Sequence, residues 1–229
     1  MNPDFPSDHP RNIIPELCRL YYSQGWMPGS GGSLSIKYGQ EVYITPSGVQ
    51  KERIQPEDLF VQTVDGEDIS VPQTTKGLRK SQCSPVFLNI YRLKAPGAVF
   101  HLHSKSAVLA TLLTKENTVH LSNLQMIKGI RKWSTGGYHK FTDDVVIPVI
   151  DNTHTEDGLI DGMVKAMNDY PDTCIVLVRG HGIYAWGQTW EQAKLVCESY
   201  DYLFDVMLQV QAAGVREVHG GVLDSGGST

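Results

Sequence analysis

The chain has 229 residues, of which 41% are hydrophobic and 20% are charged, and such a composition supports a globular core without disulfides or a structural metal. Its 20 Lys and Arg against 25 Asp and Glu give a formal net charge of −5, so the overall charge does not attract nucleic acid or an anionic membrane. No apolar run approaches the roughly 18 to 20 residues of a membrane span, and the first ten residues lack the apolar segment of a secretory signal. We therefore expect neither a nucleic-acid nor a membrane partner.

Cysteine usage and chain organisation indicate an intracellular protein with one domain. The four cysteines lie far apart without a CxxC pair, which argues against a disulfide framework or a thiolate zinc site and favours the reducing cytoplasm. No internal repeat or linker divides the chain, so a single domain is expected over residues 1–214. Glycine and serine dominate the end of the chain, and residues 215–229 are expected to form a flexible tail.

Hydrophobic periodicity predicts the secondary structure in chain order. Apolar residues at three- and four-residue spacing indicate helices over residues 10–24, 84–93, 104–113, 156–168 and 190–213. Alternating or Val- and Ile-rich segments indicate strands over residues 33–37, 41–45, 59–64, 98–103, 145–150 and 173–178. An early hairpin followed by alternating strands and helices predicts an α/β fold, with a mixed sheet covered by helices on its faces.

Two histidines end the strand expected at 98–103. Side chains two residues apart on a strand share a face, so His101 and His103 can present two imidazoles to one point while Leu102 turns into the core. A catalytic zinc site needs a third protein ligand, and His181 is the best candidate because it follows another apolar strand between two glycines that allow a close backbone approach to a ligand. An HxH pair alone is more often two ordinary histidines, and a histidine at a second strand end strengthens the metal hypothesis.

Two glycine-containing stretches are candidates for anion binding. Residues 29–33 (Gly-Ser-Gly-Gly-Ser) can expose several backbone N–H groups, and residues 45–48 (Thr-Pro-Ser-Gly) add two hydroxyls and a turn, with Lys51 nearby as a cation. Neither stretch is a Walker loop or GxGxxG, so nucleotide binding is not indicated. Glycine-rich segments beside a hairpin are usually simple turns, and both interpretations stay open at this point.

A third polar stretch, residues 80–85 (Lys-Ser-Gln-Cys-Ser-Pro), opens the helix expected at 84–93. The simplest interpretation makes Ser81 or Ser84 a helix cap and Cys83 a small core residue. A thiol at a helix N-terminus can instead contact a substrate or acquire a lowered pKa.

Taken together and in this order, these stretches resemble the class II aldolase-like family. The resemblance is strongest to the branch that removes water from 5-methylthioribulose 1-phosphate in methionine salvage and that is associated with apoptosis in animals. The matching segments are residues 9–11, 14–18, 29–33, 45–52, 80–85, 101–104, 126–129, 179–182, 184 and 186–187. A match dispersed up to about Gly214 is far more specific than any single motif.

The resemblance implies a three-layer α/β/α class II aldolase-like domain with a central mixed, largely antiparallel sheet. It also implies a homotetramer with its sites near the subunit boundaries. One zinc ion per subunit would be held by His101, His103 and His181 and would act as a Lewis acid.

The resemblance further assigns residues to the substrate. A phosphorylated ketose is the expected substrate, and 2,3-diketo-5-methylthiopentyl 1-phosphate is the expected product. Cys83 would touch the substrate, whereas Gly31, Ser47 and Gly48 would surround its phosphate.

Position 125 departs from the family pattern. The branch has a glutamate acid/base immediately before the Met-Ile-Lys-Gly stretch, and this chain has Gln125 there. A neutral amide keeps the shape and can hydrogen-bond a substrate oxygen, but it cannot accept a proton near pH 7. Because loss of a positioned acid/base group commonly lowers the rate by about 10² to 10⁴, the fold and zinc binding can persist while turnover is impaired.

Three explanations of Gln125 compete: a variant inactivated to trap substrate, a natural member whose catalytic role has lapsed or changed, or an enzyme in which another group substitutes. Glu116 lies upstream, but nothing in the sequence directs it toward the zinc. A lapsed member would be a zinc-binding interaction protein that regulates cell death with an apoptosis-pathway partner. The alternative enzyme is an aldolase or epimerase acting on another phosphorylated sugar, and its characteristic glutamate is missing near residues 81–83.

Overall fold

The structure is a computed structural model that describes residues 4–214, 217–218 and 221–222. Its α-helices are α1 (Pro10–Ser23), α2 (Ser84–Lys94), α3 (Lys105–Leu113), α4 (Ile160–Asp169) and α5 (Trp190–Ala212). Its strands are β1 (Ser33–Tyr38), β2 (Glu41–Ile44), β3 (Phe60–Gln62), β4 (Asp68–Ser70), β5 (Ala98–Leu102), β6 (Thr118–Leu121), β7 (Val145–Ile150), β8 (Ile175–Val178), β9 (Gly182–Gly187), β10 (Glu217–Val218) and β11 (Gly221–Val222). Short 3-10 turns are η1 (Lys51–Arg53), η2 (Pro56–Asp58), η3 (Thr74–Lys76), η4 (Gln125–Gly129) and η5 (Glu156–Leu159).

Nine strands form one mixed sheet in the order β4-β3-β2-β1-β5-β9-β8-β7-β6. The β7–β8 pair is parallel, and the other neighbouring pairs of this sheet are antiparallel. The expected mixed, largely antiparallel sheet is therefore confirmed.

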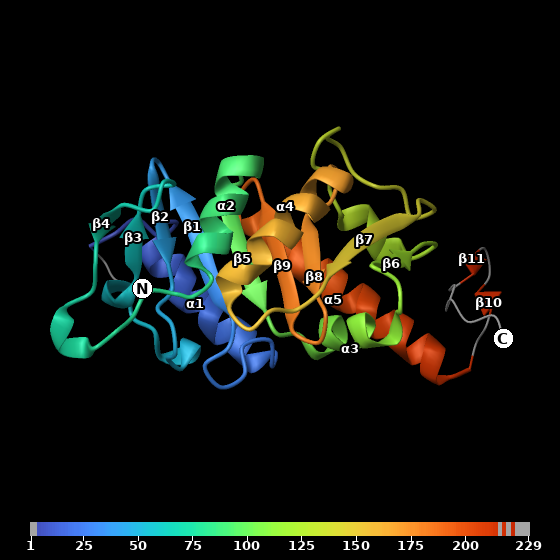
Figure 1. The fold of residues 1–229 in the computed structure, drawn as a ribbon, viewed down its shortest axis with the longest axis horizontal. Helices are drawn as coiled ribbons and strands as arrows, with labels where there is room; N and C mark the ends of the chain where they lie inside the picture. The colour runs from blue at the N-terminus through green and yellow to red at the C-terminus, as the bar shows by residue number, and fades with distance from the viewer. Residues whose placement is uncertain (1–3, 215–216, 219–220, 223–229) are drawn as a thin grey trace.

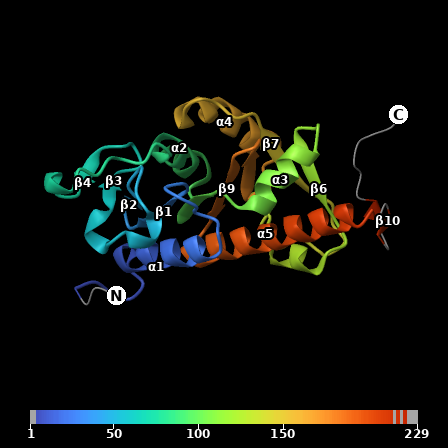
Figure 2. The ribbon, with the colours of Figure 1, turned by 90° about the horizontal axis from the view of Figure 1, so that it is seen from below.

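Helices cover both faces of the sheet and make three layers (Figure 1). Seen from below, α1 and α5 run along one side of the sheet while α2 and α4 lie on the other (Figure 2). Phe100 of β5 packs into the core formed with α1, α3 and α5, and its neighbour Val99 packs with α2 and α4. Because successive side chains of a strand alternate in direction, His101 shares the face of Val99 and points toward the layer of α2 and α4.

The expected elements are found with two kinds of difference. The helix expected at 156–168 begins as the 3-10 turn η5 and becomes α-helical only at Ile160. Three strands of the nine-stranded sheet were missed, namely β4, β6 and β9, and so were the short strands β10 and β11 in the expected tail. The side chains of β4 are all exposed, so this strand has no buried face to produce alternation. Strand β9 begins and ends with glycine, which sequence propensities assign to turns, yet it pairs on both sides, with β5 and β8.

The sheet and its helices occupy residues 10–212. The expected flexible tail, 215–229, lies mostly outside the described residues, and its described parts β10 and β11 pair with each other. Among the described helices, none combines the length and apolarity that crossing a membrane requires.

Candidate metal centre

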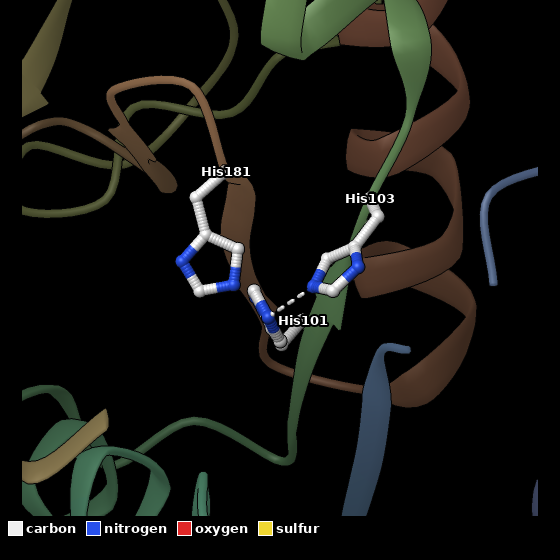
Figure 3. A group of neighbouring side chains, drawn as sticks. All are labelled: His101, His103 and His181. Atoms are coloured by element: carbon white, nitrogen blue, oxygen red, sulfur yellow. Dashed lines mark hydrogen bonds between the residues drawn. The ribbon is translucent and has the colours of Figure 1, made fainter. Parts of the chain in front are cut away.

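Three imidazoles meet at the end of β5 (Figure 3). His101 lies in β5, His103 follows that strand, and His181 lies in the turn between β8 and β9. The ring centroids of His101 and His103 are 4.7 Å apart, and that of His181 lies 4.9 Å from each. One ring nitrogen from each residue lies within 4.8 Å of the other two. The structure thus brings together the three histidines that the sequence analysis selected.

Strand pairing explains how His181 reaches the other two rings. In the β5–β9 ladder His101 lies opposite Tyr184, so the turn that precedes β9 lies beside the end of β5. Arg179 anchors this turn, because its guanidinium donates hydrogen bonds to the carbonyls of Thr111 (2.8 Å) and Thr114 (2.9 Å) near the end of α3. The position of His181 is therefore set by two strands and a helix.

The glycines on either side of His181 have different roles. Gly180 adopts a φ of +63°, which the turn requires, and it lines a cavity beside the three histidines that is described below. A Cβ on Gly182 would lie 2.2 Å from the carbonyl oxygen of Leu102, so this glycine allows β9 to approach β5. The expectation that both glycines let the backbone crowd a ligand is wrong for Gly182, whose close neighbour is another strand.

Hydrogen bonds hold two of the imidazoles in the tautomer that suits a metal. The Nδ1 atom of His101 lies 3.1 Å from the carbonyl oxygen of Ile183, and Nδ1 of His181 lies 3.2 Å from Oδ1 of Asn152. Because both oxygens can only accept, each Nδ1 carries a hydrogen, and in the neutral ring Nε2 then keeps its lone pair. Partners of this kind fix ring orientation at metal sites.

Burial keeps two of the rings neutral. Desolvation, followed by the neighbouring imidazoles of His103 and His181, lowers the pKa of His101 well below its ordinary value. Desolvation, followed by His181 and Lys51, lowers the pKa of His103 to about 4. A metal ligand must be an unprotonated imidazole, so these two residues are ready to bind a cation at pH 7.

The glycine-rich stretch lies against His103. A Cβ on Gly31 would lie 2.5 Å from His103 Nδ1 and 2.9 Å from its Cε1, which is closer than real Cβ atoms approach another atom. Glycine at this position therefore leaves room for the ring. This contact places the second sequence motif directly beside the metal candidates.

We expect Gly31→Ala to weaken zinc binding at least about tenfold, because the added methyl group displaces the His103 ring and small changes in ligand orientation carry effects of this size. Competition with a chromophoric chelator measures the affinity. Gly162→Ala in α4 is the matched control, since its new Cβ would meet Ile150 at an ordinary 3.4 Å. Equal zinc affinity in the two variants would contradict the steric argument.

A cavity of about 370 Å³ adjoins the cluster, which is large enough for a small ligand. It is lined by Gln82, His103, Asn152, Thr153, His154, Thr155, Glu156, Leu159, Gly180 and His181. The sequence analysis missed Asn152 and Glu156. The available signal was a run of polar residues directly after an apolar strand, at the sheet edge where ligands commonly bind.

Cys83 lies beside the centre as a buried, neutral thiol. It is the N-cap residue of α2, and its Sγ lies within 4.8 Å of a nitrogen of His101 and an oxygen of Glu156. Burial raises the pKa of this thiol to about 12, so the alternative in which the helix N-terminus lowers the pKa is wrong.

Buried hydroxyls connect the three polar stretches found in the sequence. The Oγ of Ser33 lies 2.8 Å from Oγ1 of Thr45 and 2.9 Å from Oγ of Ser81. Ser33 is also the β1 residue opposite His101. The glycine-rich, Thr-Pro-Ser-Gly and Lys-Ser-Gln-Cys stretches therefore converge next to one metal candidate, although they are distant in sequence.

Lys51, the cation expected beside these stretches, is bound to backbone carbonyls. Lys51 is 1% exposed, and its Nζ donates to the carbonyls of Ser30 (2.8 Å) and Val49 (3.2 Å). It joins the glycine-rich stretch to the segment after residues 45–48. An exposed cation comes from Arg79, whose backbone pairs with Ser47 and whose Nη2 lies 3.1 Å from where a Cβ of Gly48 would be.

Gln125 is not brought to this cavity within one chain. It opens η4, which follows β6 at the edge of the sheet, and it is exposed while the nearby Ile127 is buried in the core. It is not one of the residues that line the cavity. Gln125 therefore lies outside the described lining of the cavity of its own chain.

The fold and the match to a family model define the class of this protein. Residues 12–208 match the model of the Class II Aldolase and Adducin N-terminal domain, and the chain belongs to this family. Two solved L-fuculose 1-phosphate aldolases share the fold. One, 20% identical, superimposes with a TM-score of 0.71 over 91% of this chain and 89% of its own. The second, from Thermus thermophilus, is 22% identical with a TM-score of 0.65 over 88% of this chain and 94% of its own.

Curated relatives are much more similar in sequence. The methylthioribulose-1-phosphate dehydratase of Gallus gallus is 56% identical over 207 residues, which is 90% of this chain and 86% of the relative. That of Homo sapiens is 53% identical over 208 residues, or 91% of this chain and 86% of the relative. The similarity therefore covers nearly the whole length of proteins that carry this name.

Proposed function

We propose that this chain is a zinc-dependent hydro-lyase that dehydrates 5-methylthioribulose 1-phosphate to 2,3-diketo-5-methylthiopentyl 1-phosphate in methionine salvage. The observation that carries the proposal is the cluster of His101, His103 and His181 beside a cavity of about 370 Å³. The identity of 53–56% to relatives named for this reaction supports the choice of substrate over other phosphorylated sugars.

The three histidines fit a zinc ion, because imidazole nitrogens with free lone pairs are ligands that zinc prefers. When bound, zinc supplies Lewis acidity that polarises a substrate carbonyl. Ile183 and Asn152 keep two of the rings oriented. Tyr184 stacks on His101 with ring centroids 4.2 Å apart and an interplanar angle of 19°, which shields the buried side of the centre from water.

Dehydration also requires a group that removes the C3 proton and a group that protonates the departing C4 hydroxyl. We assign this acid/base role to position 125. In a homotetramer, residue 125 reaches the cavity of a neighbouring subunit. Gln125 is exposed and is not among the residues that line the cavity of its own chain, which supports this assignment. Exposed leucines on α3, namely Leu109, Leu112 and Leu113, support subunit contacts. Because Gln125 cannot accept a proton, turnover of this sequence is slow.

The substrate phosphate lies beside Gly31, Ser47 and Gly48 in this proposal, and Cys83 contacts the sugar as a neutral thiol. The convergence of the three polar stretches next to His101 supports the arrangement. The protein acts in the cytoplasm, which agrees with its four unpaired cysteines.

Arg79 lies beside Ser47 and Gly48 and is proposed to donate a hydrogen bond to the substrate phosphate. Because a charge-assisted hydrogen bond of this kind contributes about 1.5 kcal/mol, Arg79→Gln is expected to raise KM about tenfold and to leave kcat and bound zinc nearly unchanged. Steady-state kinetics measures both constants. Arg53→Gln, at another exposed guanidinium, is the control. A fall in kcat with unchanged KM would contradict a role in phosphate binding.

Metal analysis and a turnover assay on the purified, unaltered chain test the proposal. We expect about one zinc per chain and slow, zinc-dependent formation of the diketo product, followed by mass spectrometry. Absence of zinc, or failure to bind the phosphorylated ketose, would overturn the proposal. A zinc-loaded tetramer that binds the ketose without converting it would favour the lapsed enzyme with a role in protein interaction.

A further inference from the structure

A carboxylate that the sequence analysis did not select faces the histidine cluster. Glu156 opens η5, in the layer that covers the same face of the sheet as α2 and α4, and its side chain is 15% exposed. Its Oε1 lies 3.5 Å from Nε2 of His181. One of its oxygens also lies within 4.8 Å of a nitrogen of His101 and of Cys83 Sγ. Glu156 therefore lies at the edge of the proposed metal centre.

The contact between Glu156 and His181 places two electron-rich atoms together. His181 Nδ1 carries its hydrogen toward Asn152, so in the neutral ring Nε2 presents a lone pair to the carboxylate oxygen. Two acceptors facing each other are unfavourable unless a cation lies between them. Either a proton on Nε2 or a metal ion can fill this role.

The distance between His181 Nε2 and Glu156 Oε1 is the one expected for two atoms bound to the same metal ion. Zinc binds imidazole nitrogen at about 2.0–2.1 Å and carboxylate oxygen at about 2.0–2.2 Å in tetrahedral sites. Two ligand atoms of such a tetrahedron are about 3.4 Å apart, and the observed separation of Nε2 and Oε1 is 3.5 Å. A direct hydrogen bond to a protonated imidazole is usually shorter, about 2.7–2.9 Å.

The second oxygen of Glu156 is held elsewhere. The hydroxyl of Tyr184, a fully buried residue, donates a hydrogen bond to Oε2 of Glu156. The same tyrosine ring stacks on His101, so it is fixed relative to the cluster. Tyr184 thus occupies Oε2, while Oε1 faces Nε2 of His181.

We infer that Glu156, through Oε1, is a fourth protein ligand of the metal in the substrate-free protein and is displaced when substrate oxygens bind. The inference rests on the zinc site of the proposed function. In this inference Glu156 fills the coordination position that substrate would otherwise find open. Glu156 belongs to the short turn η5 and accepts a hydrogen bond from Tyr184. Removal of Glu156 then has two opposite effects, namely weaker binding of zinc and tighter binding of small oxygen ligands to the zinc that remains.

The first test compares zinc affinity by chelator competition in the unaltered chain, in Glu156→Gln and in Asp157→Asn. Asp157 is the next residue of η5 and is exposed, so its substitution makes the same charge change in the same turn without facing the histidines. We expect Glu156→Gln to weaken zinc binding by at least about 10- to 100-fold, the range for partners outside the ligand set, and Asp157→Asn to stay within about twofold of the unaltered chain. Unchanged affinity in Glu156→Gln would show that the carboxylate only pairs with a protonated His181, and would overturn the inference.

The second test uses acetohydroxamate, which binds metals through two oxygens, as the probe of the displaced position. Its dissociation constant is measured on cobalt-loaded protein from the change in the visible spectrum. We expect Glu156→Gln to bind the probe at least about tenfold more tightly than wild type, because no carboxylate has to leave. Equal or weaker binding of the probe would overturn the inference. Damage to the fold would weaken the binding of both zinc and the probe, so tighter binding of the probe cannot come from misfolding.

Tyr184→Phe keeps the test decisive if Glu156→Gln does not fold. It retains the ring that stacks on His101 and removes the hydrogen bond to Oε2, so a smaller loss of zinc affinity with a gain in probe affinity is expected. Wild type that binds no zinc would overturn the proposed function and this inference together. Wild type that binds zinc, with both variants unchanged, would overturn the inference alone.

Discussion

His181→Ala is expected to reduce bound zinc well below one equivalent per chain while the circular dichroism spectrum stays essentially that of wild type. The variant removes one of three imidazole ligands, and because loss of a hydrogen-bonding partner outside the ligand set already lowers metal affinity about 10- to 100-fold, loss of a ligand should exceed this. His181 lies in a turn with its side chain 17% exposed, and Arg179 anchors that turn independently. The fold should therefore survive.

Metal analysis after dialysis, with circular dichroism on the same sample, measures both outcomes. His120→Ala is the matched control, because this histidine lies on β6, is exposed and pairs with Asp144. It should retain full zinc. Stoichiometric zinc in His181→Ala would refute the assignment of the third ligand, and with it the reason for the proposed chemistry.

Gln125→Glu is expected to raise the rate of dehydration of 5-methylthioribulose 1-phosphate by about 10² to 10⁴, since this is the usual contribution of a positioned acid/base group. The amide already has the shape of the carboxylate, and Gln125 is exposed, so the substitution should not disturb folding or zinc content. Product formation followed by mass spectrometry measures the rate. Glu116→Gln tests the upstream glutamate in parallel and is expected to have no effect on rate.

An unchanged rate in Gln125→Glu would show that the carboxylate argument is misplaced. A fall in rate in Glu116→Gln would identify that residue as the substituting group. Zinc content measured in both variants separates these outcomes from loss of metal.

Subunit mixing tests whether residue 125 acts on a neighbouring subunit. The double variant Gln125→Glu/His181→Ala carries the carboxylate without the full metal site, whereas wild type carries the metal site without the carboxylate. Mixed oligomers should exceed the summed activity of the two separate proteins, because a wild-type cavity receives the glutamate of its neighbour. A mixture of wild type with His181→Ala is the control. No gain over that control would place residue 125 outside the neighbour's cavity.

The sequence alone predicted those features that depend on local periodicity. The helix expected at 190–213 is found as α5, Trp190–Ala212, because its apolar stripe and its cap lie within one continuous segment. Likewise, the two-residue period of a strand correctly put His101 and His103 together and turned Leu102 into the opposite core. His181 was also selected from a local pattern, a glycine-flanked histidine at a strand end, and the structure places its ring beside the other two.

The tertiary structure decided what depends on contacts between distant segments. Pairing of β9 with β5 carries His181 to the other rings, and no periodicity in residues 182–187 indicated that strand. The structure alone brings Glu156 beside His181, buries Lys51 between two loops and separates Gln125 from the cavity of its own chain. The physical reason is that periodicity specifies which face of an element is buried, whereas the packing of whole elements determines which polar side chains share a site.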